Sequence, residues 1–398
     1  MTSTTRNLLL VTALASASLL TACGGGGGGG SDSTQMGTVR FSMTDAPACG
    51  FDAVNVTVVK VRVHKSSTAS DTDTGWTDVT LSPARKIDLL TLTNGRLEEL
   101  GQAPLEAGKY TQIRLVLAAN TSASPFSNSV VPTGGTEIAL NTPSAVQSGI
   151  KLNNEFDVAA GTLADFTLDF DACKSVVTRG NGSYGLKPVV SVIPAVVSGG
   201  ISGFVTPVSP TARPLVSAQL NGVVIKTTVP DASGAFTLSP MVQSATGAGY
   251  TVVVTADGYA TDVIRAVPVV AKATTVVSTV AAPLPLSTST TYAISGRVLP
   301  VSAEGAVRAI QSYEGPTPLS VTVKYQAADL VTGAYGMSLP TAPAMLGTFG
   351  NGTLPIVLAA QPGASAGIYR VEASAPALTS QTAAVISTTP SPLDFNLN

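Results

Sequence analysis

The stretch ISGFV at residues 201–205 returns as ISGRV at residues 294–298, and each copy opens a set of strand and turn signals. In both copies a turn ending in Gly-Ala-aromatic follows, ASGAF in the first and VTGAY in the second. A strand that begins with tyrosine closes each set, YTVVVTADGY from Tyr250 and the weaker match YRVEASAPAL from Tyr369. Short strands separated by turns over about 100 residues are typical of a β-sandwich, so the repeat predicts two sandwich modules.

The two predicted modules occupy residues 199–286 and residues 292–398, with a Pro/Ser/Thr-rich linker between them. Both resemble carboxypeptidase regulatory-like domains, which are small immunoglobulin/prealbumin-like β-sandwiches. The first also carries the Asp-Gly-Tyr ending of that family at residues 257–259, whereas the second lacks it and has a longer insertion. The resemblance implies two β-sandwiches, and it keeps carbohydrate binding open because related sandwiches bind glycans.

Residues 38–198, which precede the repeats, predict a β-rich, sandwich-like N-terminal domain. TVRFSMTD and VNVTVVKVRVH alternate apolar and polar side chains, and YTQIRLVLA, FTLDFD and LKPVVSVI read as further strands. The only short helix is expected around residues 97–100. Val, Thr, Gly and Pro abound throughout, and long helical periodicity is absent, so the whole chain is predicted to be mainly β.

Several blocks of the N-terminal domain resemble one bacterial lipoprotein family in the same order. They include SMTDAPACGFDAVNVTVVKVRVH, PLEAGKYTQIRLVL, FTLDFDACKSV and YGLKPVV, all within residues 38–194. The family is known as domain of unknown function 4382. The resemblance implies a secreted β-rich domain, and it supplies neither a known activity nor catalytic residues.

The N-terminus predicts a lipid anchor. Arg6 precedes an apolar run at residues 8–20 that is too short to span a bilayer, as in a signal peptide at residues 1–22. LTAC at residues 20–23 resembles the bacterial lipobox, which implies cleavage before Cys23 and acylation of that residue. An ordinary secreted protein with a chance cysteine is the alternative. Residues 23–37 form a Gly-rich tether, and Gly24 after the cysteine favours the outer membrane by analogy.

Cys49 and Cys173 are the cysteines that remain beside Cys23. An even pair in an exported protein predicts a disulfide between them. Two buried thiols are the alternative, and a catalytic cysteine is disfavoured because no histidine lies near either residue in the sequence.

The charge composition argues against a nucleic-acid partner. The formal net charge is −2, and no basic run occurs. The only histidine, His64, ends a strand whose valines face the other side, so we expect a solvated strand residue rather than a general base. One histidine and a paired set of cysteines do not make a zinc site, and we expect neither a metal nor a cofactor.

The carboxylates of FTLDFDACK are the better candidates for chemistry. Asp169 and Asp171 share the strand face opposite Phe166, Leu168 and Phe170, and two acids on one face could begin a calcium site or a glycosidase pair. The simpler interpretation is an exposed polar face, or hydrogen bonds to neighbouring turns.

Two other predictions concern a turn and the aromatic side chains. Asp45 is expected to form a turn before Pro47, with its carboxylate bonded to backbone amides. Trp76, the only tryptophan, is the candidate platform for a ligand. The tyrosines of the repeats are expected to pack in or against the sandwich cores: Tyr250, Tyr259, Tyr292, Tyr313, Tyr325 and Tyr369.

Together these features predict a non-enzymatic cell-envelope lipoprotein that displays β-sandwich modules for adhesion, structural spacing or partner binding. Its partners would be the membrane, through the lipid on Cys23, and an envelope protein or a glycan. A carbohydrate-binding surface protein is the first alternative. A glycan or peptide hydrolase that uses Asp169 and Asp171 is the second alternative. The preferred prediction, a non-enzymatic lipoprotein, assigns no catalytic residue.

Overall fold

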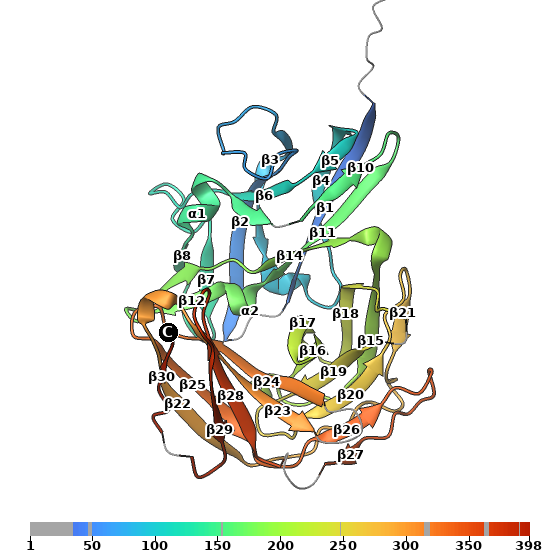
Figure 1. Cartoon of the computed structure of the whole chain (residues 1–398), viewed down its shortest axis with the longest axis vertical. Coiled ribbons are helices and arrows are strands. Elements are labelled where there is room, and N and C mark those ends of the chain that lie inside the picture. The colour runs from blue at the N-terminus through green and yellow to red at the C-terminus, as the bar shows by residue number, and fades with distance from the viewer. Residues whose placement is uncertain are drawn as a thin grey trace, which may run out of the picture. The chain divides into compact units, whose positions relative to one another are not determined.

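The computed structural model describes residues 35–46, 50–152, 154–246, 248–313, 319–361, 366–389 and 391–398. Gln35–Asn398 forms one compact unit. The described chain is mainly β, as predicted, with short helical turns between strands (Figure 1). The signal peptide, most of the tether, Cys23 and Cys49 lie outside the described residues.

The first domain contains fourteen of the described strands and three short helical elements. They are β1 (Met36–Ala46), β2 (Phe51–His64), β3 (Thr77–Asp88), η1 (Leu89–Leu92), β4 (Glu98–Glu106), β5 (Gly108–Tyr110), β6 (Gln112–Leu117), β7 (Ser129–Pro132), β8 (Ile138–Asn141), α1 (Pro143–Gln147), β9 (Ile150–Leu152), β10 (Phe156–Val158), β11 (Leu163–Asp171), α2 (Ala172–Ser175), β12 (Val176–Arg179), β13 (Ser183–Leu186) and β14 (Val190–Pro194).

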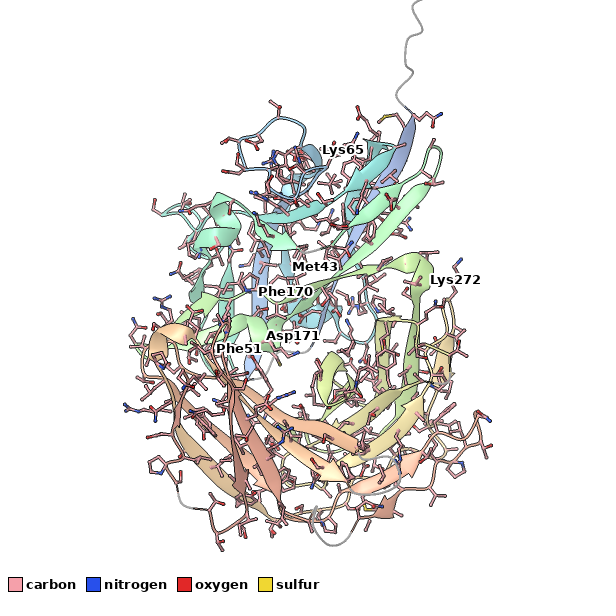
Figure 2. The ribbon with its side chains drawn as sticks, viewed as in Figure 1. Met43, Phe51, Lys65, Phe170, Asp171 and Lys272 are labelled. Atoms are coloured by element: carbon pink, nitrogen blue, oxygen red, sulfur yellow. The ribbon has the colours of Figure 1, made fainter. Side chains whose placement is uncertain are left out.

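Two main sheets enclose the core of the first domain. One has the order β14-β11-β1-β4, with β1 parallel to β11, and the other runs β12-β13-β8-β7-β2-β6-β9 with β3 paired to β2. The alternating pattern of β1 and β2 places apolar side chains such as Phe41, Met43 and Val58 in this core. Phe170 of β11 joins them, and Met43 and Phe170 both lie in the interior (Figure 2).

The predicted helix at residues 97–100 is wrong, because that segment begins β4. Glu98–Glu106 pairs antiparallel with β1, and Leu100 and Leu105 point into the core. The local Leu-Glu-Glu-Leu sequence suits a helix, but pairing with β1 satisfies the backbone hydrogen bonds of both strands. The strand β1 also starts at Met36, so the last residues assigned to the tether belong to the sheet.

Module 1, the first repeat, consists of η2 (Ala195–Val197), β15 (Ser198–Phe204), η3 (Pro210–Ala212), β16 (Leu215–Leu220), β17 (Val223–Thr228), β18 (Ala235–Val242), β19 (Tyr250–Thr255), β20 (Asp262–Val267) and β21 (Thr274–Val276). Its three-stranded sheet β18-β15-β21 packs on a sheet in the order β17-β16-β19-β20. Ile201, Phe236 and Val252 belong to the core between them.

Module 2, the second repeat, consists of β22 (Thr291–Leu299), η4 (Val301–Ala303), β23 (Ala306–Tyr313), β24 (Leu319–Ala327), β25 (Ala334–Pro340), β26 (Met345–Thr348), β27 (Ala359–Ala360), β28 (Tyr369–Ser374), β29 (Gln381–Val385) and β30 (Phe395–Asn396). Its own sheets are β25-β22-β30 and β24-β23-β28-β29.

The insertion of the second repeat crosses into module 1. Strand β26 pairs in parallel with β20, and β27 continues that sheet (Figure 1). Val253 and Val263 of module 1 also belong to the core cluster of module 2. The predicted boundary between residues 286 and 292 therefore separates two sets of sheets, but one sheet of module 1 continues into β26 and β27, and two of its valines pack in the core of module 2.

The Gly-Ala-aromatic turns explain why the repeats share this motif. Gly234 and Gly333 have φ of +84° and +69°, in the left-handed region that favours glycine. A Cβ at Gly234 would lie 2.0 Å from the carbonyl oxygen of Val205, and one at Gly333 would lie 2.5 Å from that of Val298. Each turn thus presses against the end of the strand that contains ISGFV or ISGRV.

Candidate functional site

The polar face of β11 is covered, which corrects the expectation of an exposed Asp169. Lys226 of β17 in module 1 places its Nζ 2.5 Å from Oδ1 of Asp169, and the two side chains are 3% and 8% exposed. Burial raises the pKa of Asp169, and the Lys226 ammonium opposes that shift. The face of β11 that was predicted to be exposed to solvent therefore supplies Asp169 to a buried ion pair between the first domain and module 1.

Asp171 has a different role at the end of the same strand. It caps α2, because its Oδ1 accepts a hydrogen bond of 3.0 Å from the backbone N–H of Lys174. Its Oδ2 lies 2.7 Å from Nζ of the same lysine. The alternative interpretation of hydrogen bonds to a neighbouring turn thus describes Asp171 but not Asp169.

Asp45 is the third carboxyl group of this region; its carboxylate bonds to a backbone amide, as predicted, and the residues that would complete the predicted turn lie outside the described ones. It lies in β1, fully buried, and its Oδ1 accepts a 2.9 Å hydrogen bond from the N–H of Ala172. Burial raises its pKa well above the usual range, and the nearby Asp171 and Asp169 add to that effect. Among the described residues its Oδ2 has no hydrogen-bond partner.

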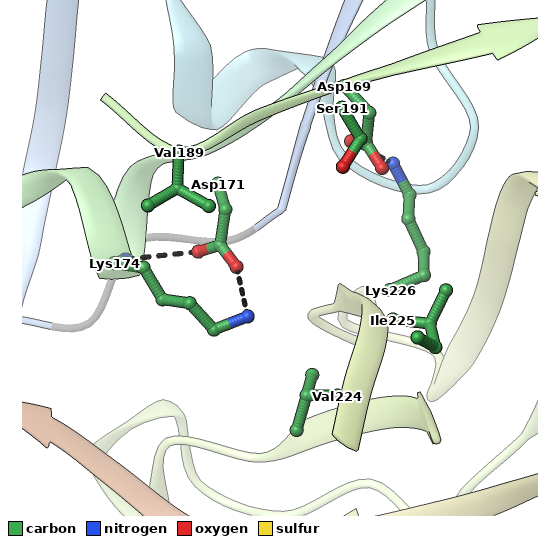
Figure 3. A pocket seen from close by; sticks show the side chains of 8 residues that line it. All are labelled: Asp169, Asp171, Lys174, Val189, Ser191, Val224, Ile225 and Lys226. Atoms are coloured by element: carbon green, nitrogen blue, oxygen red, sulfur yellow. Dashed lines mark hydrogen bonds and ion pairs between the residues drawn. The ribbon is translucent and has the colours of Figure 1, made fainter. Parts of the chain in front are cut away.

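A small cavity of about 100 Å³ lies between these charges (Figure 3). Asp169 and Asp171 line it from the first domain, and Val224 and Lys226 line it from module 1. It has room for a few water molecules. The part of the chain that the structure describes contains no group of three His, Cys, Asp or Glu side chains that could hold a metal ion.

Both carboxylates proposed for a hydrolase are already engaged by lysines. A glycosidase needs one carboxyl group that releases a proton to substrate and a second that attacks or activates water. The ammonium groups of Lys226 and Lys174 instead form ion pairs with Asp169 and Asp171. The geometry at this cavity therefore suits a structural junction better than acid–base catalysis.

His64 and Trp76 both hold the loop between β2 and β3. Nδ1 of His64 accepts a 2.8 Å hydrogen bond from the N–H of Ser66, and Nε2 lies 3.0 Å from the carbonyl oxygen of Thr74. The indole N–H of Trp76 donates to the carbonyl oxygen of Ser70 at 2.8 Å. The His64 ring is thus used by the backbone, on the polar strand face where it was expected.

Trp76 is also occupied by the protein's own cations. The guanidinium groups of Arg62 and Arg114 lie 4.7 and 4.8 Å from the centroid of its ring. The His64 ring lies 5.0 Å away. Cation–π contacts at these distances stabilise the loop and compete with a stacked ligand. Trp76 therefore fits a structural role better than the ligand platform that the sequence suggested.

The tyrosines of the repeats differ in their burial. Tyr250, Tyr313 and Tyr369 are buried in the cores, as predicted, and Tyr259 and Tyr292 are half-buried. Tyr325 on β24 is exposed, in contrast to the expectation. It lines a second cavity, of about 260 Å³, where the first domain meets module 2.

Other contacts between the modules gave no signal in the sequence. Asn94, in the TNG turn of the first domain, donates through Nδ2 to the carbonyl oxygen of Val229 at 3.0 Å and accepts from the N–H of Thr237 at 3.0 Å. Asp329 of module 2 accepts a 2.7 Å hydrogen bond from the N–H of Gly180. A turn-forming Asn or Asp is common on protein surfaces, so its docking role is invisible before the fold is known.

The predicted disulfide between Cys49 and Cys173 stays a prediction. Cys173 is the second residue of α2, two positions after the Asp171 cap, and it is half-buried. Its predicted partner lies outside the described residues.

The first domain can now be compared with known families. Residues 36–188 match the family model described as a domain of unknown function, DUF4382. The match covers the segment in which the sequence blocks resembled that family. The DUF4382 region includes Asp169, Asp171 and Lys174, whereas Lys226 and Tyr325 belong to the modules that follow.

Similar solved structures come from several bacterial proteins. A type II cohesin–X-dockerin complex of Acetivibrio cellulolyticus is 27% identical over 22% of this chain and 56% of that chain, with a TM-score of 0.18. The Bacillus anthracis TIE protein is 10% identical over 91% of this chain and 50% of that chain, with a TM-score of 0.15.

Two B repeat units of the collagen-binding protein of Staphylococcus aureus are 10% identical over 85% of this chain and 95% of that chain, with a TM-score of 0.16. At these TM-scores none of the three carries an argument about this chain. No curated protein matches the sequence.

Proposed function

We propose that this chain is a non-enzymatic lipoprotein of the bacterial cell envelope that presents its three β-modules as one rigid unit. Adhesion, structural spacing or partner binding would be the purpose of that display. The observation that carries the proposal is the buried Lys226–Asp169 ion pair, which joins module 1 to the first domain. Separate modules on a flexible linker do not require buried charge between them.

The energetics of the junction support rigidity. Separating module 1 from the first domain would hydrate both charges, but it would also release the hydrogen bonds of Asn94 to Val229 and Thr237. Separating module 1 from module 2 would break the pairing of β20 with β26 and expose part of a shared core. The lost hydrogen bonds, strand pairing and shared core favour the docked arrangement over independent motion.

The N-terminal segment supports attachment to a membrane. No helix among the described residues is long and apolar enough to cross a bilayer. The lipobox-like residues 20–23 would supply acyl chains at Cys23, and two or more chains hold a protein stably. The glycines that follow would let the modules stand off the headgroups, and the outer membrane is the proposed location.

Metabolic labelling tests the anchor. Cells that express the full chain receive an alkyne fatty acid, and the protein is then isolated from fractionated envelopes. We expect label on the wild-type protein and none on Cys23→Ser, because the thioether and the new amino terminus both require that cysteine. A wild-type protein that carries no label, or a label that persists in Cys23→Ser, would contradict the proposal.

A further inference from the structure

The 260 Å³ cavity between the first domain and module 2 is lined by charged, aromatic and apolar side chains, as ligand sites often are. Lys174, Val177 and Lys187 line it from the first domain, and Glu304, Tyr325 and Leu330 line it from module 2. Its volume is below the range of about 300–1,000 Å³ found for drug-sized ligands, so it suits a compact ligand. The site exists only when the two parts are docked.

Tyr325 offers an aromatic face in this cavity. Tyr325 is 37% exposed, and Nζ of Lys174 lies 5.8 Å from the ring centroid, farther away than the two guanidinium groups over Trp76. Burial raises the pKa of Tyr325 to about 12, and its neutral hydroxyl group can both donate and accept a hydrogen bond. An aromatic ring with a polar tip suits a ligand that has an apolar face and polar edges.

The charges around the ring cancel in pairs. Lys174 lies 2.7 Å from Asp171, and Nζ of Lys187 lies 3.4 Å from the Glu304 carboxylate and donates to the Glu304 carbonyl oxygen at 2.8 Å. A polyanion would need unpaired cations, and a fully apolar ligand would strip water from both ion pairs. A neutral ligand with several hydroxyl groups can use the ammonium donors and the carboxylate acceptors together.

We propose that this cavity binds one or two rings of a neutral saccharide. The C–H face of a pyranose would lie on the Tyr325 ring, and its hydroxyl groups would contact Lys174, Lys187 and Glu304. Val177 and Leu330 supply the apolar wall behind the ring. The proposal goes beyond display, and it does not depend on the lipid anchor, so either can fail alone.

Saturation-transfer NMR on the full-length protein tests the site. The probes are glucose, galactose, mannose, N-acetylglucosamine, maltose, cellobiose and chitobiose, each at millimolar concentration. We expect transfer to the ring C–H protons of at least one sugar, followed by calorimetry on that sugar. Tyr325→Ala should weaken binding by at least about tenfold, and Tyr325→Phe should stay within about threefold of wild type.

Phe126→Ala is the matched control, because Phe126 is 40% exposed and does not line the cavity. It should leave binding unchanged. Glu304→Gln keeps the shape and removes a charged acceptor, so it gives a second measurement if Tyr325→Ala does not fold. The absence of transfer from any of the seven sugars would overturn the proposal. Wild-type affinity in both Tyr325→Ala and Glu304→Gln would also overturn it. Binding of a random peptide pool that requires Tyr325, without any sugar signal, would assign the cavity to a protein partner instead.

Discussion

The two sandwich modules share one turn motif, yet only one of them uses it for docking. In module 1, Oδ1 of Asp231 accepts hydrogen bonds from the N–H groups of Ser233 and Ala235 and closes its own turn. In module 2, Asp329 bonds the N–H groups of its own turn in the same manner and also accepts from Gly180 of the first domain. The same local chemistry therefore becomes an interface where a neighbouring backbone amide lies within reach.

Asp262 and Gln381 are the first residues of β20 and β29, which occupy equivalent places in the two modules. Asp262 is paired with Val254 in module 1, and Gln381 is paired with Ala373 in module 2. Gln381 exchanges hydrogen bonds with the backbone of Asn396. Asp262 is buried beside the inserted strand β26, and neither of its oxygens has a partner among the described residues. The insertion has covered a carboxyl group without satisfying it.

The largest expected effect concerns Asp262 and pH. Burial raises the pKa of Asp262 to about 8, whereas the unfolded chain titrates near 4. Between these pH values the folded state holds a proton that the unfolded state has lost. The free energy of unfolding therefore falls by about 1.4 kcal/mol for each unit by which the pH rises. The free energy cost of ionising Asp262 is absent below about pH 4, where both states are protonated, grows between about pH 4 and pH 8, and is complete above about pH 8.

Urea unfolding of wild type and Asp262→Asn from pH 4 to pH 9 measures that slope. The variant should show a flatter profile by several kcal/mol over the range, whatever its absolute stability. Asp157→Asn, an exposed change on β10, is the control and should leave the slope as it is. Parallel profiles for wild type and Asp262→Asn would show that Asp262 is hydrated or paired in solution.

The next largest effect separates the two docking interfaces of the first domain. Lys226→Met leaves Asp169 buried without a cation and should lower the free energy of unfolding by about 3–5 kcal/mol. Lys187→Met breaks an exposed pair with Glu304 and should cost about 1 kcal/mol or less. Urea unfolding at pH 7 gives both values.

The double variant Lys226→Met/Asp169→Leu sharpens that test. It removes both charges and should recover most of the stability that Lys226→Met loses, because no buried charge is left unpaired. Equal losses for Lys226→Met and Lys187→Met would mean that the Lys226–Asp169 contact opens to water in solution.

The smallest effect compares the two turn aspartates directly. Asp329→Ala removes the turn bonds and the contact to Gly180, and it should cost about 2–3 kcal/mol. Asp231→Ala removes only turn bonds, at about 1–2 kcal/mol. The difference should appear in urea unfolding midpoints at pH 7. A loss for Asp231→Ala equal to that for Asp329→Ala would remove the docking role of Asp329.

Local pattern was sufficient for most of the strands. Alternation in VRVH placed Val61 and Val63 of β2 inward, whereas the bulge between Val58 and Lys60 that brings the earlier valines to the same face emerged only in the structure. The repeated Gly-Ala-aromatic turns marked corresponding strands of the two modules. It failed at residues 97–100, where β4 replaced a helix, because partner strands outweigh weak helix propensity. It also failed at Asp169, because its partner Lys226 is distant in sequence.

The sequence by itself determined the mainly β class, the two repeats, the match to the DUF4382 family and the burial of three of the repeat tyrosines. These follow from short-range periodicity, turn residues and apolar composition, all of which act within a few neighbours. Only the tertiary structure decided that Lys226 meets Asp169, that β26 joins the sheet of module 1 and that Tyr325 lines a cavity. Those contacts join side chains and strands far apart in the chain, and their free energy comes from burial, charge pairing and backbone hydrogen bonds that no local stretch contains.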